Sequence, residues 1–240
     1  FNGCNQDRVA PPGAREKGGA HGFEIQERDG GVRADFMANF NAKDRIIECK
    51  IVYYGPGRGG KTTNLEYIYK AGRKYATGEM VSIDTKGDRT LFFDFLPIGL
   101  GKVRGCEVKM QLFTVPGQVK YSSTRKMVLK GVDGLVFVAD SLEIRRKANL
   151  VSLKDLQDNL KDEGKSIFKI PLVLQYNKRD LEEEGLPLMP IEKMDRDLNS
   201  KLKAPAFPGS ALKGTGVGPT LKRCMELTLR HLKKELDWAE

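Results

Sequence analysis

Glycines followed by a lysine and a threonine form the part of the sequence best suited to chemistry. The run GPGRGGKT, residues 55–62, fits the spacing G-x-x-x-x-G-K-[ST]. Its glycines allow successive backbone N–H groups to curl around a phosphate. Lys61 can reach the β- and γ-phosphates of a nucleotide, and Thr62 can place its hydroxyl on Mg²⁺. The residues expected to bind phosphate or to flank it are Gly55, Gly57, Arg58, Gly59, Gly60, Lys61, Thr62 and Thr63.

The run NKRD, residues 177–180, is suited to choosing the base. A carboxylate at Asp180 can accept hydrogen bonds from N1–H and the 2-amino group of guanine, and adenine offers neither donor. The aliphatic stem of Lys178 can cover the base plane, and Asn177 can tie this loop to the phosphate cradle. NKRD alone would also suit a surface loop. Its place after the apolar run LVLQY, downstream of the cradle, favours guanine recognition.

A second loop is expected to help hold the base. The run GSAL, residues 209–212, follows the last expected strand, and the backbone N–H groups of Ser210 and Ala211 can support the guanine oxygen. Leu212 completes the expected set. The signal is weak alone, but the order of cradle, NKRD and GSAL along the chain predicts a guanine-nucleotide site.

Apolar runs and turn signals predict the elements that must hold these residues. Runs rich in β-branched and aromatic residues predict six strands, and stretches of helical periodicity between them predict helices. Strands that alternate with helices indicate a doubly wound α/β fold. We expect a mostly parallel six-stranded sheet with helices on both faces and one antiparallel hairpin that turns at residues 99–105. The strands are IIECKIVYY, TLFFDFLPI, CEVKMQLFTV, VDGLVFVAD, IPLVLQYN and PAFPGSA, and the helices span residues 61–76, 144–163, 190–202 and 218–236.

The chain divides into two regions by composition. Residues 1–44 are rich in glycine and poor in aliphatic residues, so we expect a flexible N-terminal extension. Residues 45–240 carry the strand and helix patterns of a globular domain. No apolar run is long enough to predict a transmembrane segment. The four cysteines are far apart in sequence, which favours free thiols, three in the core and one in the extension, and a cytoplasmic compartment.

The net charge of +9 leaves one question open. Residues 101–131 carry seven basic side chains and one acidic side chain. Such a run can form a solvated face or can meet an acidic partner, an anionic lipid or nucleic acid. Its basic residues are not interleaved with aromatic residues in the way that suits stacking on bases, so no nucleic-acid partner is expected.

The motifs taken together resemble a known family. Their order along the chain is similar to that of Ras-like small GTPases. The runs CKIVYYGPG, GKTTNLEYIY, DRTLFFDFLP, TVPGQVKY and LKGVDGLVFVADS closely resemble the bacterial MglA family. The resemblance covers about Arg45 to Leu236 and leaves out the N-terminal extension, as in an extended, SofG-like paralogue. It implies a P-loop NTPase of Ras-like fold with GTP or GDP and Mg²⁺ as cofactors.

The resemblance also implies roles for the switch residues. Gln118 would orient the attacking water, and Arg89 would act as an arginine finger supplied by the chain itself. The N–H of Gly117 would bond the γ-phosphate, and Thr90 would join Thr62 as a Mg²⁺ ligand. An alternative for Arg89 is a loop charge that faces solvent. The acid usual before the catalytic glutamine is Thr114 here, which is the pattern of the MglA family.

The family resemblance implies a biological setting. MglA-like proteins are polarity switches for gliding and pilus motility, and they use a roadblock-type activating partner, MglB. We therefore expect a cytoplasmic switch, placed at a cell pole, that hydrolyses GTP slowly and meets motility, pilus or cytoskeletal effectors. The alternative is a nucleotide-binding scaffold with little hydrolysis that recruits such effectors.

Overall fold

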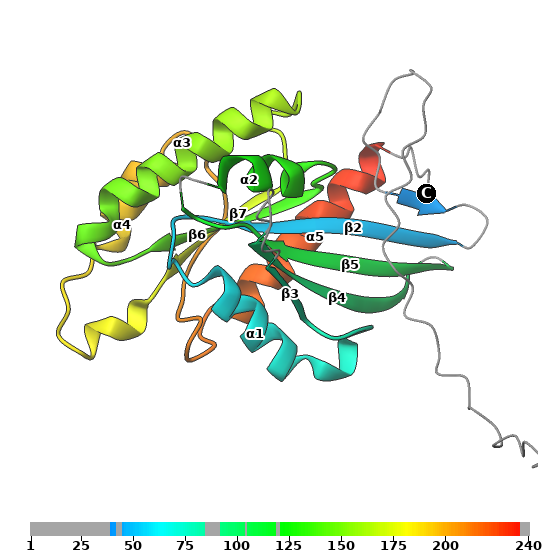
Figure 1. Cartoon of the computed structure of the whole chain (residues 1–240), viewed down its shortest axis with the longest axis horizontal. Helices are drawn as coiled ribbons and strands as arrows, with labels where there is room; N and C mark the ends of the chain where they lie inside the picture. The colour runs from blue at the N-terminus through cyan, green and yellow to red at the C-terminus, as the bar shows by residue number, and fades with distance from the viewer. Residues whose placement is uncertain (1–38, 42–44, 85–91, 104, 119–120, 236–240) are drawn as a thin grey trace, which may run out of the picture. The chain divides into compact units, whose positions relative to one another are not determined.

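A mostly parallel sheet organises the protein. The computed structural model describes residues 39–41, 45–84, 92–103, 105–118 and 121–235. The strand order is β3-β4-β5-β2-β6-β7-β8, and β1 pairs with β2. Strands β5, β2, β6, β7 and β8 run parallel, while β3 and β4 are antiparallel additions at one edge (Figure 1). The strands are β1 (Asn39–Asn41), β2 (Ile46–Tyr54), β3 (Val81–Asp84), β4 (Phe92–Val103), β5 (Cys106–Thr114), β6 (Gly134–Asp140), β7 (Leu172–Asn177) and β8 (Ala206–Pro208).

The predicted fold class is confirmed, and the sheet is larger than predicted. All six predicted strands are present, and β1 and β3 are two short additions. The turn predicted at residues 99–105 is wrong in extent, because β4 continues to Val103, where it still pairs with Cys106 of β5. The register between β4 and β5 shifts between Gly99 and Lys102. The glycines in this segment are typical of a turn, so the sequence did not predict that the strand continues. Strand β1 lies within residues 1–44, and the domain boundary stays a prediction.

Helices cover both faces of the sheet, as predicted (Figure 1). Helices α1 and α5 pack on one face with the inward side chains of β2, including Ile51 and Tyr53. Helices α2, α3 and α4 pack on the other face, where they meet Val52 and Tyr54. The central strand is therefore buried on both sides, which explains its nearly continuous apolar sequence. The helices are α1 (Lys61–Ala71), α2 (Ser122–Leu129), α3 (Arg146–Asp162), α4 (Ile191–Met194) and α5 (Val217–Glu235).

Helix α2 was not predicted, and it lies inside the basic run 101–131. Arg125 of this helix is buried and pairs with Asp155 of α3, and Lys126 pairs with Asp162 at 2.7 Å. Two cations of the run are therefore paired with carboxylates of α3 and do not form a continuous basic face. Arg104 and Lys120 lie outside the described residues.

Three of the four cysteines lie in the described part of the chain. Cys49, Cys106 and Cys224 are free and buried, as predicted, and Cys4 lies outside the described residues. Burial raises the pKa of the Cys49 and Cys224 thiols to about 12. In the described part of the chain, no helix has both the length and the apolar character needed to cross a membrane.

Candidate nucleotide-binding site

The predicted site residues gather at the carboxyl ends of the parallel strands. Gly55 follows β2 directly, Asp140 ends β6, and Asn177 ends β7. In open α/β sheets this edge is where ligands bind. The fold therefore brings the predicted phosphate cradle and the predicted base loop to the same place.

The cradle depends on glycine at two points. Gly55 has φ 145° and Gly60 has φ 95°, and both values disfavour larger residues. A Cβ atom on Gly55 would lie 2.2 Å from the Val138 carbonyl oxygen, and one on Gly60 would lie 2.2 Å from Asn177 Nδ2. Helix α1 begins at the next residue, and no described side chain caps its N-terminus. Its first N–H groups can therefore serve an anion.

Lys61 is held inside the cradle. Its Nζ donates to the carbonyl oxygens of Gly55 at 3.0 Å and Pro56 at 2.8 Å, and the residue is 7% exposed. Burial, together with the nearby Arg125 and Arg145 guanidinium groups, lowers the pKa of Lys61 to about 7. A bound phosphate would place a negative charge beside this buried ammonium group and stabilise its charged form. The cradle is therefore suited to an anionic ligand.

A buried carboxylate that sequence reasoning missed lies beside Thr62. Asp94 of β4 is 1% exposed, and its Oδ2 accepts hydrogen bonds from Thr62 Oγ1 at 2.6 Å and Thr114 Oγ1 at 2.7 Å. Ser82 Oγ donates to the other oxygen at 2.7 Å. Asp94 therefore supplies an acid next to Thr114, the residue that stands where related GTPases have an acid. The sequence contained a signal for the burial of Asp94, because alternate residues of a strand share a face and Asp94 alternates with the buried Leu96 and Ile98.

The loop that carries Gln118 packs directly on the cradle. A Cβ atom on Gly117 would lie 2.2 Å from the backbone nitrogen of Gly57, so only glycine allows this approach. A Cβ atom on Gly57 would lie 3.8 Å from Gln118 Cγ. Gln118 thus lies beside the cradle, with its side chain exposed. Its backbone carbonyl accepts a hydrogen bond from Arg125 Nη1 at 2.6 Å.

Asn177 ties the base loop to the cradle, the contact that the sequence predicts. Its Nδ2 donates to the Gly59 carbonyl at 2.8 Å, and its Oδ1 accepts from the Ala211 N–H at 2.8 Å. The Ser210 N–H donates to the Thr215 carbonyl at 2.9 Å. Both N–H groups expected to support guanine therefore have protein partners in this structure. The side chain of Leu212 is 74% exposed.

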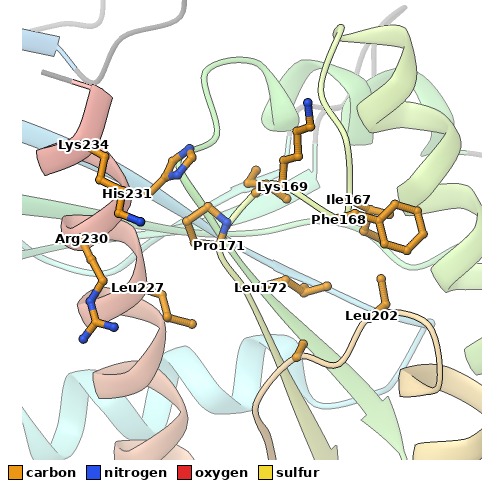
Figure 2. A pocket seen from close by; sticks show the side chains of 12 residues that line it. Ile167, Phe168, Lys169, Pro171, Leu172, Leu202, Leu227, Arg230, His231 and Lys234 are labelled. Carbon is orange, nitrogen blue, oxygen red and sulfur yellow. The ribbon is translucent and has the colours of Figure 1, made fainter. Parts of the chain in front are cut away.

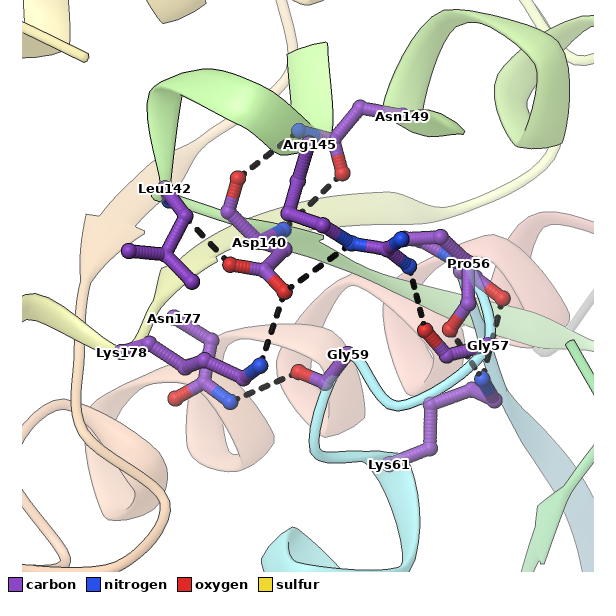
Figure 3. A network of polar contacts seen from close by, with 11 residues as sticks. Pro56, Gly57, Gly59, Lys61, Asp140, Leu142, Arg145, Asn149, Asn177 and Lys178 are labelled. Atoms are coloured by element: carbon purple, nitrogen blue, oxygen red, sulfur yellow. Dashed lines mark hydrogen bonds and ion pairs between the residues drawn. The ribbon is translucent and has the colours of Figure 1, made fainter. Parts of the chain in front are cut away.

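One carboxylate connects the base loop with the phosphate cradle. Asp140 is fully buried at the end of β6, and its Oδ2 accepts from Lys178 Nζ at 2.8 Å (Figure 3). The same oxygen lies 3.5 Å from Arg145 Nε, and Arg145 Nη2 donates to the Gly57 carbonyl at 2.6 Å. Sequence reasoning missed Asp140 and Arg145. The signal for Asp140 was an acid at the carboxyl end of the buried run VFVAD.

Of the remaining predicted site residues, three lie in the described part of the chain and two lie outside it. Asp180 is half-buried in the short 3-10 helix η4 (Arg179–Glu182) that follows Lys178. Arg58 is exposed at the cradle rim with φ 60°, and Thr63 is half-buried on α1. Arg89 and Thr90 lie outside the described residues.

The sheet, the glycine cradle and the base loop at its carboxyl edge define the class of Ras-like P-loop nucleotide-binding proteins. The chain is 50% identical over 198 residues to the Mutual gliding-motility protein MglA of Myxococcus xanthus, which covers 82% of this chain and 99% of that protein. The chain therefore belongs to the MglA family of small Ras-like GTPases and is a GTPase, which confirms the resemblance seen in the sequence.

More distant relatives belong to the ADP-ribosylation factor-like proteins. Protein 4D of Mus musculus is 29% identical over 207 residues, covering 83% of this chain and 90% of that protein. Protein 4A of Homo sapiens is 25% identical over 195 residues, covering 76% and 84%. No protein-family model matches the chain.

Proposed function

We propose that this GTPase is a guanine-nucleotide switch that hydrolyses GTP slowly and controls the placement of motility or pilus machinery at a cell pole. The observation that carries the switch is the close packing of Gly117 on Gly57. A γ-phosphate bound in the cradle would meet this loop, and its loss would release the loop. The motility role rests on the similarity to MglA, a gliding-motility protein. We place the protein in the cytoplasm.

The residues around Thr62 are suited to Mg²⁺. Hydroxyl and carboxylate oxygens are ligands that Mg²⁺ prefers, and Mg²⁺ usually keeps several waters. Thr62 and Thr90 would hold the ion directly. Asp94 would orient one of the waters on the ion, because it supplies the negative charge that the Thr114 side chain lacks. When bound, Mg²⁺ neutralises phosphate charge.

Replacing Asp94 with asparagine is expected to weaken Mg²⁺ binding to the GDP complex by about 10- to 100-fold, the usual effect of losing an outer-shell carboxylate. The measurement is the release rate of a fluorescent GDP analogue as the free Mg²⁺ concentration is varied. Ser82→Ala is the matched control, because it removes a hydroxyl from the same carboxylate and leaves the charge in place. Equal Mg²⁺ dependence in wild type and Asp94→Asn would exclude this role.

Hydrolysis would depend on Gln118 and Arg89. Gln118 would orient the attacking water, and Arg89 would neutralise charge on the transferring phosphoryl group. An MglB-like roadblock protein is the activating partner that we propose. Motility, pilus or cytoskeletal effectors would bind the GTP form, in part through residues 1–44.

A single-turnover assay with GTP tests this function. With an MglB-like protein present, Gln118→Ala is expected to lower the hydrolysis rate by about 100-fold, a typical effect of misplacing a reactant. Binding of GDP should change little, because Gln118 is exposed beside the cradle. If Gln118→Ala leaves stimulated turnover unchanged, Gln118 is not catalytic. If wild type also fails to turn over, the scaffold alternative is correct.

A further inference from the structure

A groove lies at the end of the sheet opposite the nucleotide site. It begins where β7 begins, at Pro171 and Leu172, whereas the base loop follows the other end of the same strand. The groove consists of two hollows, of about 270 Å³ and about 240 Å³, that share Lys169, Ile170 and His231. No residue of the proposed nucleotide site lines either hollow.

Apolar side chains line the groove from more than one element. Phe168, in the loop between α3 and β7, is 59% exposed, and Leu172 and Leu202 line the hollow with it (Figure 2). Leu227 of α5 lines the hollow from the opposite side. The floor is closed by Ile167 and Leu172, each 5% exposed. An aliphatic or aromatic side chain from a partner could therefore be removed from water here.

Cationic side chains also line the groove, two from α5 and one from the loop between α3 and β7. Arg230 and Lys234 extend from the last turns of α5, and Lys169 lies across from them on the loop that also carries Phe168 (Figure 2). Among the described residues, none of these three side chains has an ion-pair or hydrogen-bond partner. By contrast, Lys126 and Arg146 elsewhere on the surface are paired with carboxylates.

Among the described residues, few acidic side chains line the groove. The larger hollow has no acidic residue among the described residues that line it. The smaller hollow has Asp133, whose Oδ2 already accepts a hydrogen bond from the Lys50 N–H at 2.7 Å. The groove thus combines apolar side chains with cations that pair with no described residue, which favours a ligand that is apolar and acidic.

We propose that this groove docks an acidic segment of a partner protein. An apolar side chain of that segment lies between Phe168, Leu202 and Leu227, and its carboxylates contact Arg230, Lys234 and Lys169. A protein segment fits better than a lipid surface, because Leu202 and Leu227 line a hollow and do not protrude from the molecule. Because the groove is remote from the cradle, docking does not depend on whether GDP or GTP is bound.

A random peptide library displayed on phage, selected against the GDP-loaded full chain, tests the proposal. We expect enriched peptides to combine several acidic residues with an aliphatic or aromatic residue. Fluorescence anisotropy then measures their affinity for wild type and variants. The double variant Arg230→Glu and Lys234→Glu should weaken binding by at least about tenfold, since like charges would face each other. Phe168→Ser should also weaken binding.

Lys222→Glu is the matched control, because Lys222 is exposed on α5 and outside the groove. All variants should keep wild-type GDP affinity, so a failure of docking is separate from a failure of the proposed switch. The proposal is overturned if the enriched peptides lack acidic residues or bind the groove variants as tightly as wild type. A different result would assign the groove to membranes and would also overturn the proposal. In that case the selection recovers no acidic peptide, the protein binds phosphatidylglycerol vesicles, and Arg230→Glu abolishes that binding.

Discussion

Replacing Asp180 with asparagine is expected to weaken GDP and GTP binding by roughly 10⁴-fold, the discrimination typical of a site built around such hydrogen bonds. A carboxylate accepts from both N1–H and the 2-amino group of guanine, whereas an asparagine amide presents a donor toward that amino group. Asp180 is half-buried, so water would compensate only part of this loss. The variant should lose more affinity than any other single change in the base loop.

The same substitution should create a new preference. Xanthine carries an oxygen where guanine has its 2-amino group, so the asparagine amide can donate to that oxygen while its carbonyl accepts from N1–H. Competition of GDP and xanthosine diphosphate for a fluorescent nucleotide measures the change. Glu184→Gln, the same acid-to-amide change at an exposed position in the same loop, is the control and should bind GDP as wild type does.

The outcome depends on where the backbone places Asp180. Lys178 adopts φ 69°, and the Arg179 N–H donates to the Gly209 carbonyl at 3.0 Å, which fixes the start of the short helix that carries Asp180. If Asp180→Asn bound GDP normally, or gained no affinity for xanthosine diphosphate, Asp180 would not contact the base edge. The guanine assignment would then rest on family membership alone.

The sequence predicted the parts of the site that consist of contiguous motifs. The cradle and NKRD each specify a local backbone shape, and the predicted contact between Asn177 and Gly59 is present at 2.8 Å. Asp94 and Asp140 were missed because their partners are 32 and 38 residues away in sequence, at Thr62 and Lys178. No periodicity argument pairs such positions. Both are acids in otherwise apolar strands, so a buried charge without a local partner was the available signal.

The same reasoning explains the errors in the fold. The six predicted strands have strong apolar patterns, whereas β3 is a short edge strand whose Val81 is 46% exposed. Helix α2 contains two serines, a threonine, an arginine and a lysine in eight residues, so it lacks an obvious apolar stripe. Its stability depends on the contacts that Arg125 makes with α3 and with the Gln118 loop, and these contacts are long-range.

Removing the Arg125 side chain, as in Arg125→Met, is expected to destabilise the protein and slow GTP hydrolysis together. Arg125 Nε and Nη2 donate to the two oxygens of Asp155 at 2.8 and 3.3 Å, and Nη1 donates to the carbonyl oxygens of Gln118 and Pro116 at 2.6 and 3.3 Å. The guanidinium therefore connects helix α3 with the loop that lies on the cradle. Arg125 is a positioning residue for Gln118, since it contacts the backbone of that residue.

Asp155 is itself held in a network. The Tyr54 hydroxyl donates to its Oδ2, and Asn159 Nδ2 donates to the same oxygen at 3.2 Å. Burial and the hydrogen bond to this carboxylate raise the pKa of Tyr54 well above its usual range. The side chain of Arg125 is 7% exposed and that of Asp155 is 32% exposed. Breaking such a pair should cost about 3 kcal/mol in the free energy of unfolding, the lower end for buried ion pairs.

Stability alone does not distinguish positioning from packing, so the kinetic result is decisive. Arg125→Met should lower the single-turnover rate of GTP hydrolysis by up to about 100-fold while GDP affinity stays close to wild type, because displacing a reactant by 1 Å can have that effect. Arg125→Lys should not restore the rate, since one ammonium group cannot bond the carboxylate and two carbonyls in a fork. Asp155→Asn should share the defect, and the double variant should be no slower than Arg125→Met.

Lys126→Met is the matched control. Lys126 is adjacent on the same helix and pairs with Asp162 of α3 at 2.7 Å, but both side chains are about half exposed, at 46% and 54%. Exposed pairs of this kind contribute little, so the control should keep both stability and hydrolysis. If Arg125→Met lost stability but hydrolysed GTP at the wild-type rate below its melting temperature, the Gln118 loop would be held by other contacts. If Lys126→Met slowed hydrolysis equally, the effect would belong to the packing of α2 and not to the guanidinium of Arg125.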